Sequence, residues 1–205
     1  MPTGVIVAGG RSTRFGEADK AVASLGGTPM VRHVADRLAS VVDSLVVNCR
    51  ADQRGRIEDA LDGYPLPVRF AVDEATDEGP MAGIGTGLRA VESEYAVVVA
   101  CDMPFVDPGV VSYLFERAAG HDAAVPKLDD GWYQTTQAVY RADAMADACE
   151  AALAAGEHKI LAPLDRLDWV VVGEAGLRER GSLDTFENVN TREELRAAEE
   201  RLRRR

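Results

Sequence analysis

Near its start the sequence reads Gly4-Val5-Ile6-Val7-Ala8-Gly9-Gly10-Arg11-Ser12-Thr13-Arg14-Phe15-Gly16, an apolar run that passes directly into a glycine-rich segment. The run is short, which is typical of a buried β-strand that ends where turn residues begin. Gly9 and Gly10 lack Cβ atoms, so their backbone N–H groups can approach an anion closely and converge on it. A strand that leads into such a loop is the expected first unit of an α/β domain.

Segments with the features of strands and helices alternate along the rest of the chain. Tyr95–Ala100 is almost wholly apolar and β-branched, which predicts a central strand covered on both faces. This alternation favours right-handed crossovers and a mostly parallel sheet, so we predict one domain, residues 1–205, folded as a Rossmann-like three-layer α/β/α sandwich. Further strands are expected at 44–48, 67–72, 123–126, 137–140 and 169–172, and helices at 30–42, 53–61, 79–90, 108–119, 145–155 and 191–203.

Composition excludes several classes of protein. The formal charge of −11 on 205 residues argues against a nucleic-acid partner, because a phosphate backbone would be repelled. We find no apolar run of the roughly 20 residues that a membrane span needs and no signal peptide, so we expect a cytoplasmic protein. The acidic, lysine-poor composition resembles that of salt-adapted proteins. The three cysteines show no metal-binding spacing and are expected to be buried as small hydrophobes; they are Cys49, Cys101 and Cys149.

Three cations accompany the glycine pair. Arg11 and Arg14 carry forked donors that suit phosphate oxygens, and Lys20 adds a point charge. A turn with arginines facing solvent would give the same letters, but three cations within twelve residues of the glycines are unusual in so acidic a chain. The segment fits neither the Walker A pattern nor G-x-G-x-x-G. We therefore predict a phosphate-binding loop of a different type.

Polar residues also follow the predicted strands, where ligands of α/β sheets bind. Asp102 comes directly after the apolar strand and can either hold Mg²⁺ through a hard oxygen or cap the next turn. Asn48 ends a strand and Asp73 begins a turn, and neither is informative alone. Asn188 and Asn190 precede the last helix, and their position alone favours helix capping, because Asn is a good N-cap.

These segments together resemble a known family. Val7 to Gly16 is similar to the nucleotidyltransferase signature L-A-G-G-x-x-x-R-M-G, with mild changes at Val7 and Phe15. Within that superfamily the chain looks most like the molybdenum cofactor guanylyltransferases, and the similarity extends nearly end to end. It continues through Leu25-Gly26-Gly27-Thr28-Pro29-Met30, Val46-Val47-Asn48, Asp73-Glu74, Gly79-Pro80-Met81-Ala82-Gly83, Ala100-Cys101-Asp102-Met103-Pro104-Phe105 and Asn188-Val189-Asn190-Thr191.

The resemblance implies a set of site residues on a fold of the nucleotide-diphospho-sugar transferase type. Asp102 would bind Mg²⁺, while Arg14 and Lys20 would stabilise the triphosphate and the leaving pyrophosphate, with help from Arg11. The guanine nucleotide would contact the main chain at Val7, Ala8, Gly9 and Gly10, and also Asn48, Asp73, Gly79, Pro80, Ala82, Asn188 and Asn190. The segment of the two asparagines would reach back to the active site near the metal and the acceptor, with Asn190 capping the last helix and Asn188 facing the site. Small residues at 79–83 would equally serve close helix packing.

The implied reaction is transfer of GMP from GTP to the terminal phosphate of molybdopterin. The alternatives are CTP with molybdopterin, GTP with a cobinamide phosphate or a phospholactate, and a non-catalytic GTP-binding adaptor. A nicotinamide-dependent oxidoreductase would need a glycine fingerprint that this chain lacks. Transient contact with enzymes that make or receive the cofactor is also expected.

Two features complete the expectations. The segment 131–137 falls where the family usually has Gln-Pro followed by His or Thr, and its lack of proline departs from the pattern for acceptor recognition. Trp132 and Trp169 are interpreted as packing residues. The whole assignment requires Asp102 to lie close to the segment from Gly9 to Lys20.

Overall fold

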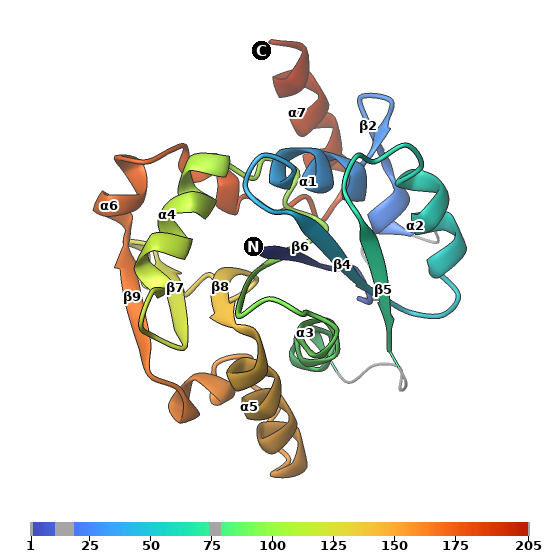
Figure 1. Ribbon diagram of the computed structural model, residues 1–205. Helices are drawn as coiled ribbons and strands as arrows, with labels where there is room; N and C mark the ends of the chain where they lie inside the picture. The colour runs from blue at the N-terminus through green and yellow to red at the C-terminus, as the bar shows by residue number, and fades with distance from the viewer. Residues whose placement is uncertain (1, 11–18, 74–78, 205) are drawn as a thin grey trace.

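The computed structural model describes residues 2–10, 19–73 and 79–204. Seven strands form one sheet in which parallel pairs predominate, and helices cover both faces (Figure 1). The predicted three-layer sandwich with a mostly parallel sheet is therefore confirmed. In the order in which they lie side by side, the strands are β5 (Val68–Val72), β4 (Ser44–Cys49), β1 (Thr3–Val7), β6 (Tyr95–Ala100), β8 (Gln137–Arg141), β7 (Ala123–Lys127) and β9 (Trp169–Gly173).

Successive residues of the inner strands enter different cores. Val5 of β1 packs in the core under α3 and α5, whereas Ile6 packs in the core under α1, α2 and α4 on the opposite face (Figure 1). Burial on both sides is the consequence of a continuous apolar run. The helices are α1 (Met30–Leu38), α2 (Arg54–Ala60), α3 (Pro80–Arg89), α4 (Pro108–Ala118), α5 (Ala142–Ala154), α6 (Glu174–Arg178) and α7 (Arg192–Arg203).

The register of the sheet brings three strand ends to one edge. Val7 of β1 lies opposite Asn48 of β4 and Ala100 of β6. The main chain of Ala8 donates to Asn48 O at 2.9 Å, and that of Cys101 donates to Val7 O at 3.0 Å, so the ladder continues into the loops. The chain leaves β1 toward β4, while β6 lies on the other side of β1. This edge therefore holds a topological switch point, where ligands of open α/β sheets bind.

The sheet includes a strand whose direction we did not predict. β8 runs antiparallel to both β6 and β7. Residues 128–136 connect β7 to β8, and so short a connection cannot hold the crossover of about a dozen residues that parallel neighbours need. The sequence pattern also missed the hairpin of β2 (Ser24–Leu25) and β3 (Thr28–Pro29) and the short helix α6.

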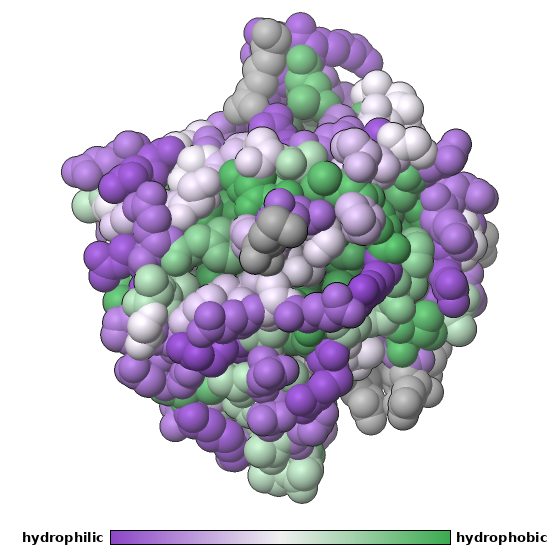
Figure 2. Space-filling view, viewed as in Figure 1, coloured by the Kyte–Doolittle hydropathy of each residue, from purple (hydrophilic) through white to green (hydrophobic). Residues whose placement is uncertain are grey.

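Hydrophilic residues cover much of the face seen in Figure 2, including the helices at its periphery. Within the described ranges, none of the helices is long and apolar enough to cross a membrane. Trp132 is 73% exposed, so its interpretation as a packing residue is wrong. Trp169 is half-buried and meets the ring of Tyr133 edge-on, with 5.4 Å between ring centroids.

A pair of glycines tests how closely α3 packs on the sheet. A Cβ at Gly87 would lie 2.6 Å from Val5 Cγ1, so we expect Gly87→Ala to lower the free energy of unfolding by about 1–3 kcal/mol. Gly55 is exposed in α2 and has open space around it, so Gly55→Ala should raise the free energy by about 0.5–1 kcal/mol. Urea unfolding measures both; changes of the same sign would contradict this packing.

Candidate active site at the carboxyl edge of the sheet

Lys20 and Asp102 meet at the switch point. The Nζ atom of Lys20 donates to Asp102 Oδ2 at 2.7 Å and to Asn190 Oδ1 at 2.7 Å. The two side chains of the ion pair are 8% and 19% exposed, so water is largely kept away but a ligand can still reach them. Charges in such surroundings interact more strongly than in bulk water. The required proximity of Asp102 to the end of the glycine-rich segment is present.

Local hydrogen bonds fix both members of this pair. The side chain of Asp19 accepts from Ala21 N at 3.1 Å and so caps the 3₁₀ turn η2 (Lys20–Val22) that presents Lys20. Asp102 lies in the turn after β6, and its carbonyl oxygen accepts from Val189 N at 2.9 Å. This bond ties the strand that precedes α4 to the segment that precedes α7. Three distant parts of the chain thus converge on one point.

Both groups retain capacity for a ligand. Asp102 Oδ1 is buried and has no hydrogen-bond partner among the described residues. An ammonium has three donors, and the contacts above use two of those of Lys20. In the described ranges no three His, Cys, Asp or Glu residues gather as a metal cluster. The arrangement therefore suits a cation at Asp102 that takes its other ligands from a bound anion.

Asp73 and Asn48 lie beside the glycine pair. A Cβ at Gly9 would overlap Asp73 Oδ2, so glycine is required for this approach. Asn48 is completely buried, and its Nδ2 donates to Asp73 Oδ1 at 2.6 Å and to Ala71 O at 3.2 Å. Asn48 therefore orients the Asp73 carboxylate against the loop. Direct contact of Asn48 or Asp73 with a nucleotide stays a prediction.

The small residues at the start of α3 differ in their exposure. Gly79, with φ +83°, and Pro80 are exposed, and Ala82 is half-buried, so these three can be reached from outside. Gly83 instead faces the sheet, where a Cβ would lie 2.5 Å from Asn48 Oδ1. The packing interpretation therefore holds for Gly83. Nucleotide contacts of Gly79, Pro80 and Ala82 stay predictions.

The two asparagines before α7 differ from the expectation. Thr191 is the N-cap of α7: its side chain accepts from Glu194 N, and the Glu194 side chain accepts from Thr191 N in a capping box. Asn190 is thus not the cap, because its side chain is turned to Lys20. Asn188 is exposed, and its contact with a ligand stays a prediction.

Two of the predicted site residues are not described by the structure, and two residues at the site were not predicted from the sequence. Arg11 and Arg14 fall outside the described residues. Arg50 and Gln53, which follow β4 at the same edge, contact the glycine-rich loop, and sequence reasoning did not select them. Their sequence signal was their place after a buried strand, where polar side chains face the site.

The cysteines behave as predicted. All three are free and buried. Burial, followed by the Asp73 carboxylate, raises the pKa of the Cys49 thiol to about 11. Burial likewise raises the pKa of Cys101, and it raises that of Cys149 to about 12. Neutral, buried thiols are poor nucleophiles, so no reactive role is indicated.

Comparisons with known proteins agree with this geometry. The family model described as "MobA-like NTP transferase domain" matches residues 4–168. A probable molybdenum cofactor guanylyltransferase from Natronomonas pharaonis is 54% identical over 98% of both chains. The corresponding protein of Haloferax mediterranei is 40% identical over 97% of this chain and 93% of its own.

Solved structures extend the comparison. Molybdopterin-guanine dinucleotide biosynthesis protein A from Archaeoglobus fulgidus superposes with a TM-score of 0.81 at 30% identity, over 99% of this chain and 100% of that one. A 4-diphosphocytidyl-2C-methyl-D-erythritol synthase from Anaerococcus prevotii gives a TM-score of 0.73 at 17% identity, over 98% of this chain and 96% of that one. The second likeness concerns the fold alone.

Proposed function

The chain belongs to the MobA-like NTP transferase family and is a nucleotidyltransferase, and we propose that it transfers GMP from GTP to the terminal phosphate of molybdopterin. One observation carries the proposal: Lys20, Asp102 and Asn190 meet at the switch point of the sheet. Relatives that match nearly the whole chain are named molybdenum cofactor guanylyltransferases, which supports the choice of nucleotide and acceptor.

The reaction needs positioning and charge neutralisation more than a strong base. An oxygen of the acceptor phosphate bonds to the α-phosphorus of GTP, and the bond from that phosphorus to the oxygen bridging to the β-phosphate breaks. Pyrophosphate leaves with this oxygen and its electron pair. A phosphate monoester is largely dianionic at neutral pH, since its second pKa is about 6, so the nucleophile is already deprotonated. The protein holds the two phosphates in line.

The residues around the loop divide this work. The remaining donor of Lys20 binds a phosphate oxygen and offsets the charge that develops on the leaving pyrophosphate. Backbone groups from Val7 to Gly10 line the triphosphate. We propose the same task for Arg14, with help from Arg11. Asn190 holds the Lys20 ammonium in place through the bond of 2.7 Å.

A divalent metal fits Asp102. Nucleotidyltransferases of this family generally use one, and we propose Mg²⁺. The buried Oδ1 of Asp102, which has no hydrogen-bond partner in the described part of the chain, is a hard donor of the kind that Mg²⁺ prefers. Mg²⁺ typically takes one or two carboxylates together with substrate phosphates, which agrees with a single protein carboxylate here. When bound, it would neutralise phosphate charge and polarise the α-phosphate.

We propose that the nucleotide base binds on the side of the site where β4 and β5 end. Guanine offers two donors, N1–H and the exocyclic amine, and needs acceptors opposite them. Asp73, which follows β5 and is oriented by Asn48, is such an acceptor beside Gly9. This feature favours GTP over CTP, because cytosine has no ring N–H on its pairing edge.

We propose that the acceptor binds on the other side of Asp102, near the segment that connects β7 to β8. Ala100 N donates to Thr136 O at 2.9 Å, which joins the end of β6 to the segment before β8. The connection from β7 ends there, and it presents Trp132 with 73% of its surface exposed. Trp132 N donates to Asp130 Oδ1 at 2.9 Å, and Leu128 N donates to Trp132 O at 3.2 Å, so the backbone beneath the indole is fixed. We propose that the indole stacks on the flat pterin of the acceptor.

Asp102 is tested by charge removal. Asp102→Ala and Asp102→Asn should each lower kcat of Mg²⁺-dependent pyrophosphate release by about 10³-fold, because the carboxylate that holds the metal is lost. Circular dichroism should show an intact fold. Asp147→Asn is the matched control, since this carboxylate is exposed on α5 and bonded to Arg89. Near-normal turnover in both Asp102 variants would refute the metal assignment.

A change at Trp132 should affect the acceptor and not the nucleotide. Trp132→Ala should raise KM for the acceptor roughly tenfold, because stacking on an aromatic side chain is worth about 1–3 kcal/mol, and should leave KM for GTP unchanged. Trp132→Phe should recover most of the loss. Steady-state kinetics with each substrate varied in turn decides the matter; an equal rise in both constants would argue against a stacking role.

The reaction itself is tested by a screen. GTP, CTP, ATP and UTP are each incubated with molybdopterin, a cobinamide phosphate and a phospholactate, and pyrophosphate release is measured. We expect release with GTP and molybdopterin. Release with CTP, or with another acceptor, would identify a related transferase. Binding of GTP with no release for any acceptor would indicate an adaptor.

A further inference from the structure

Three consecutive carbonyl groups of the glycine-rich loop are bonded to one neighbouring segment. Gln53 Nε2 donates to Ala8 O at 3.1 Å. Arg50 Nη1 donates to Gly9 O at 2.9 Å and to Gly10 O at 3.2 Å. Both side chains come from the connection between β4 and α2. We call the side chains of Arg50 and Gln53 the carbonyl clasp.

The clasp dictates where the amide groups of the loop point. In a trans peptide the C=O and N–H bonds point in opposite directions. Because the carbonyls of Ala8 and Gly9 face the clasp, the N–H groups of Gly9 and Gly10 face away from it. Successive N–H groups on one side form an anion-binding concavity. Among the described residues, no atom would lie within 4 Å of a Cβ at Gly10, so on that side a phosphate can approach.

Gln53 also joins the two ends of the glycine-rich segment. The same Nε2 atom that binds Ala8 O donates to Asp19 Oδ1 at 3.0 Å, and Asp19 precedes Lys20. Gln53 is completely buried, and its Oε1 accepts from Arg50 N at 3.0 Å, so its amide orientation is fixed. One side chain thus sets the spacing between the loop's first peptide and the turn that presents Lys20.

Each side chain of the clasp contacts an aspartate: Arg50 contacts Asp52, and Gln53 contacts Asp19. Asp52 accepts from Arg50 Nε at 3.1 Å, and the Arg50 side chain is 14% exposed. Asp19 lies 3.5 Å from a guanidinium nitrogen of Arg56. The clasp is therefore rigid before any ligand arrives, which lowers the cost of ordering the site upon binding.

We infer that Arg50 and Gln53 are positioning residues for the nucleotide: they turn the Gly9 and Gly10 N–H groups toward the triphosphate and set their distance from Lys20. The inference rests on the proposed function, because it takes a nucleoside triphosphate as the ligand. Neither side chain needs to touch the substrate.

The test compares clasp variants by GTP affinity and kinetics. Gln53→Leu and Arg50→Met should each raise Kd and KM for GTP at least roughly tenfold, since two amide donors to a charged group lose their orientation. KM for the acceptor should not change. Gln53→Glu keeps the size of the side chain but sets a carboxylate against Ala8 O and Asp19, so it should be as damaging as Gln53→Leu. Arg50→Lys keeps a donor and should recover part of the affinity.

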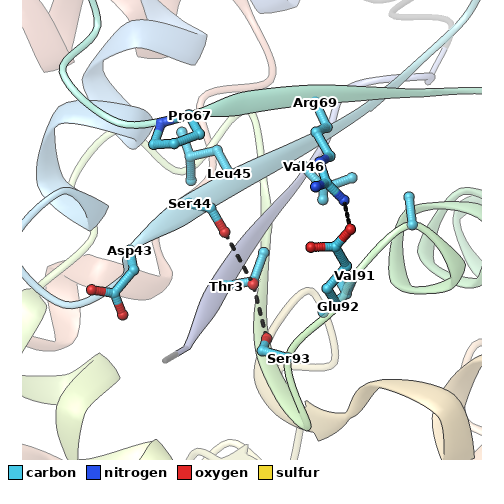
Figure 3. A pocket seen from close by; sticks show the side chains of 11 residues that line it. Thr3, Asp43, Ser44, Leu45, Val46, Pro67, Arg69, Val91, Glu92 and Ser93 are labelled. Atoms are coloured by element: carbon cyan, nitrogen blue, oxygen red, sulfur yellow. Dashed lines mark hydrogen bonds and ion pairs between the residues drawn. The ribbon is translucent and has the colours of Figure 1, made fainter.

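The hollow in Figure 3 supplies a matched control at the opposite edge of the sheet. It has a volume of 420 Å³, and its polar groups bond one another: Ser93 Oγ donates to Thr3 Oγ1 at 2.8 Å, and Ser44 Oγ lies 3.2 Å from the same atom. Thr3 is buried at the start of β1, the strand that leads to the loop. Thr3→Val removes two partly buried hydrogen bonds at the other end of β1, but should leave GTP affinity unchanged.

The outcomes separate this inference from the proposed function. Normal GTP affinity in folded Gln53→Leu and Arg50→Met would overturn the clasp. An equal loss of affinity in Thr3→Val would also overturn it, because general destabilisation would explain the result. If Gln53→Leu does not fold, the pair Arg50→Met and Arg50→Lys decides. If the wild-type protein binds CTP and not GTP, the guanine assignment fails, and the same variants are judged with CTP.

Discussion

The ion pair between Lys20 and Asp102 joins the segment after β1 to the turn after β6 and so fixes the geometry of the candidate site. Burying two charges is costly, and their mutual attraction often does no more than offset that cost, so such a pair is weak evidence for stability alone. Here each partner also remains incomplete: Asp102 Oδ1 has no hydrogen-bond partner among the described residues, and Lys20 has a donor left over. In our proposal, the free oxygen of Asp102 binds a cation and the remaining donor of Lys20 binds an anion. Asn190, bonded to Lys20 at 2.7 Å, keeps the ammonium in place.

The inner strands are largely apolar and buried on both faces, and the register in which they pair creates the site. Val7, Asn48 and Ala100 lie side by side, so the loops after β1, β4 and β6 leave from one edge. Each loop then contributes a different kind of group: backbone amides after β1, the carbonyl clasp after β4, and a carboxylate after β6. A shift of one residue in any of these strands would turn its side chains to the other face and break this convergence. Close packing of α3 preserves it, because Gly83 and Gly87 admit the helix to the strands that carry these loops.

Much of this could be predicted from the sequence, and the failures have physical causes. The spacing of apolar residues located β1, β4 to β9 and the long helices. Each of these elements repeats its buried positions over a few neighbouring residues, so a short stretch of sequence is enough to reveal it. The direction of β8 depends instead on the length of the connection from β7, which periodicity does not weigh. Asp102 and Lys20 could be chosen because unusual residue types follow a strand and a glycine loop. Arg50 and Gln53 were not chosen, because their place after a buried strand is a weak signal and their bonds to main-chain carbonyls some 40 residues away form no sequence motif. The wrong choice of Asn190 as the cap in place of Thr191 has a similar origin: both residue types cap helices, and the contact of Asn190 with Lys20 appears only in the folded chain.

A chain of formal charge −11 can still bind a polyanion, because the interactions at this site are short-ranged. Exposed charges farther away than a Debye length, about 8 Å at physiological ionic strength and about 3 Å at 1 M salt, are largely screened. Besides Arg14 and Arg11, the groups that meet the triphosphate in our proposal are an ammonium 8% exposed and backbone amides, and neither of these depends on the net charge of the surface. Arg50 is tied to carbonyl oxygens and to Asp52, so its charge also acts locally. Rising salt weakens the repulsion by the acidic surface more than it weakens the buried contacts. An acidic exterior and an anion-binding interior are therefore compatible, and they become more so as the ionic strength increases.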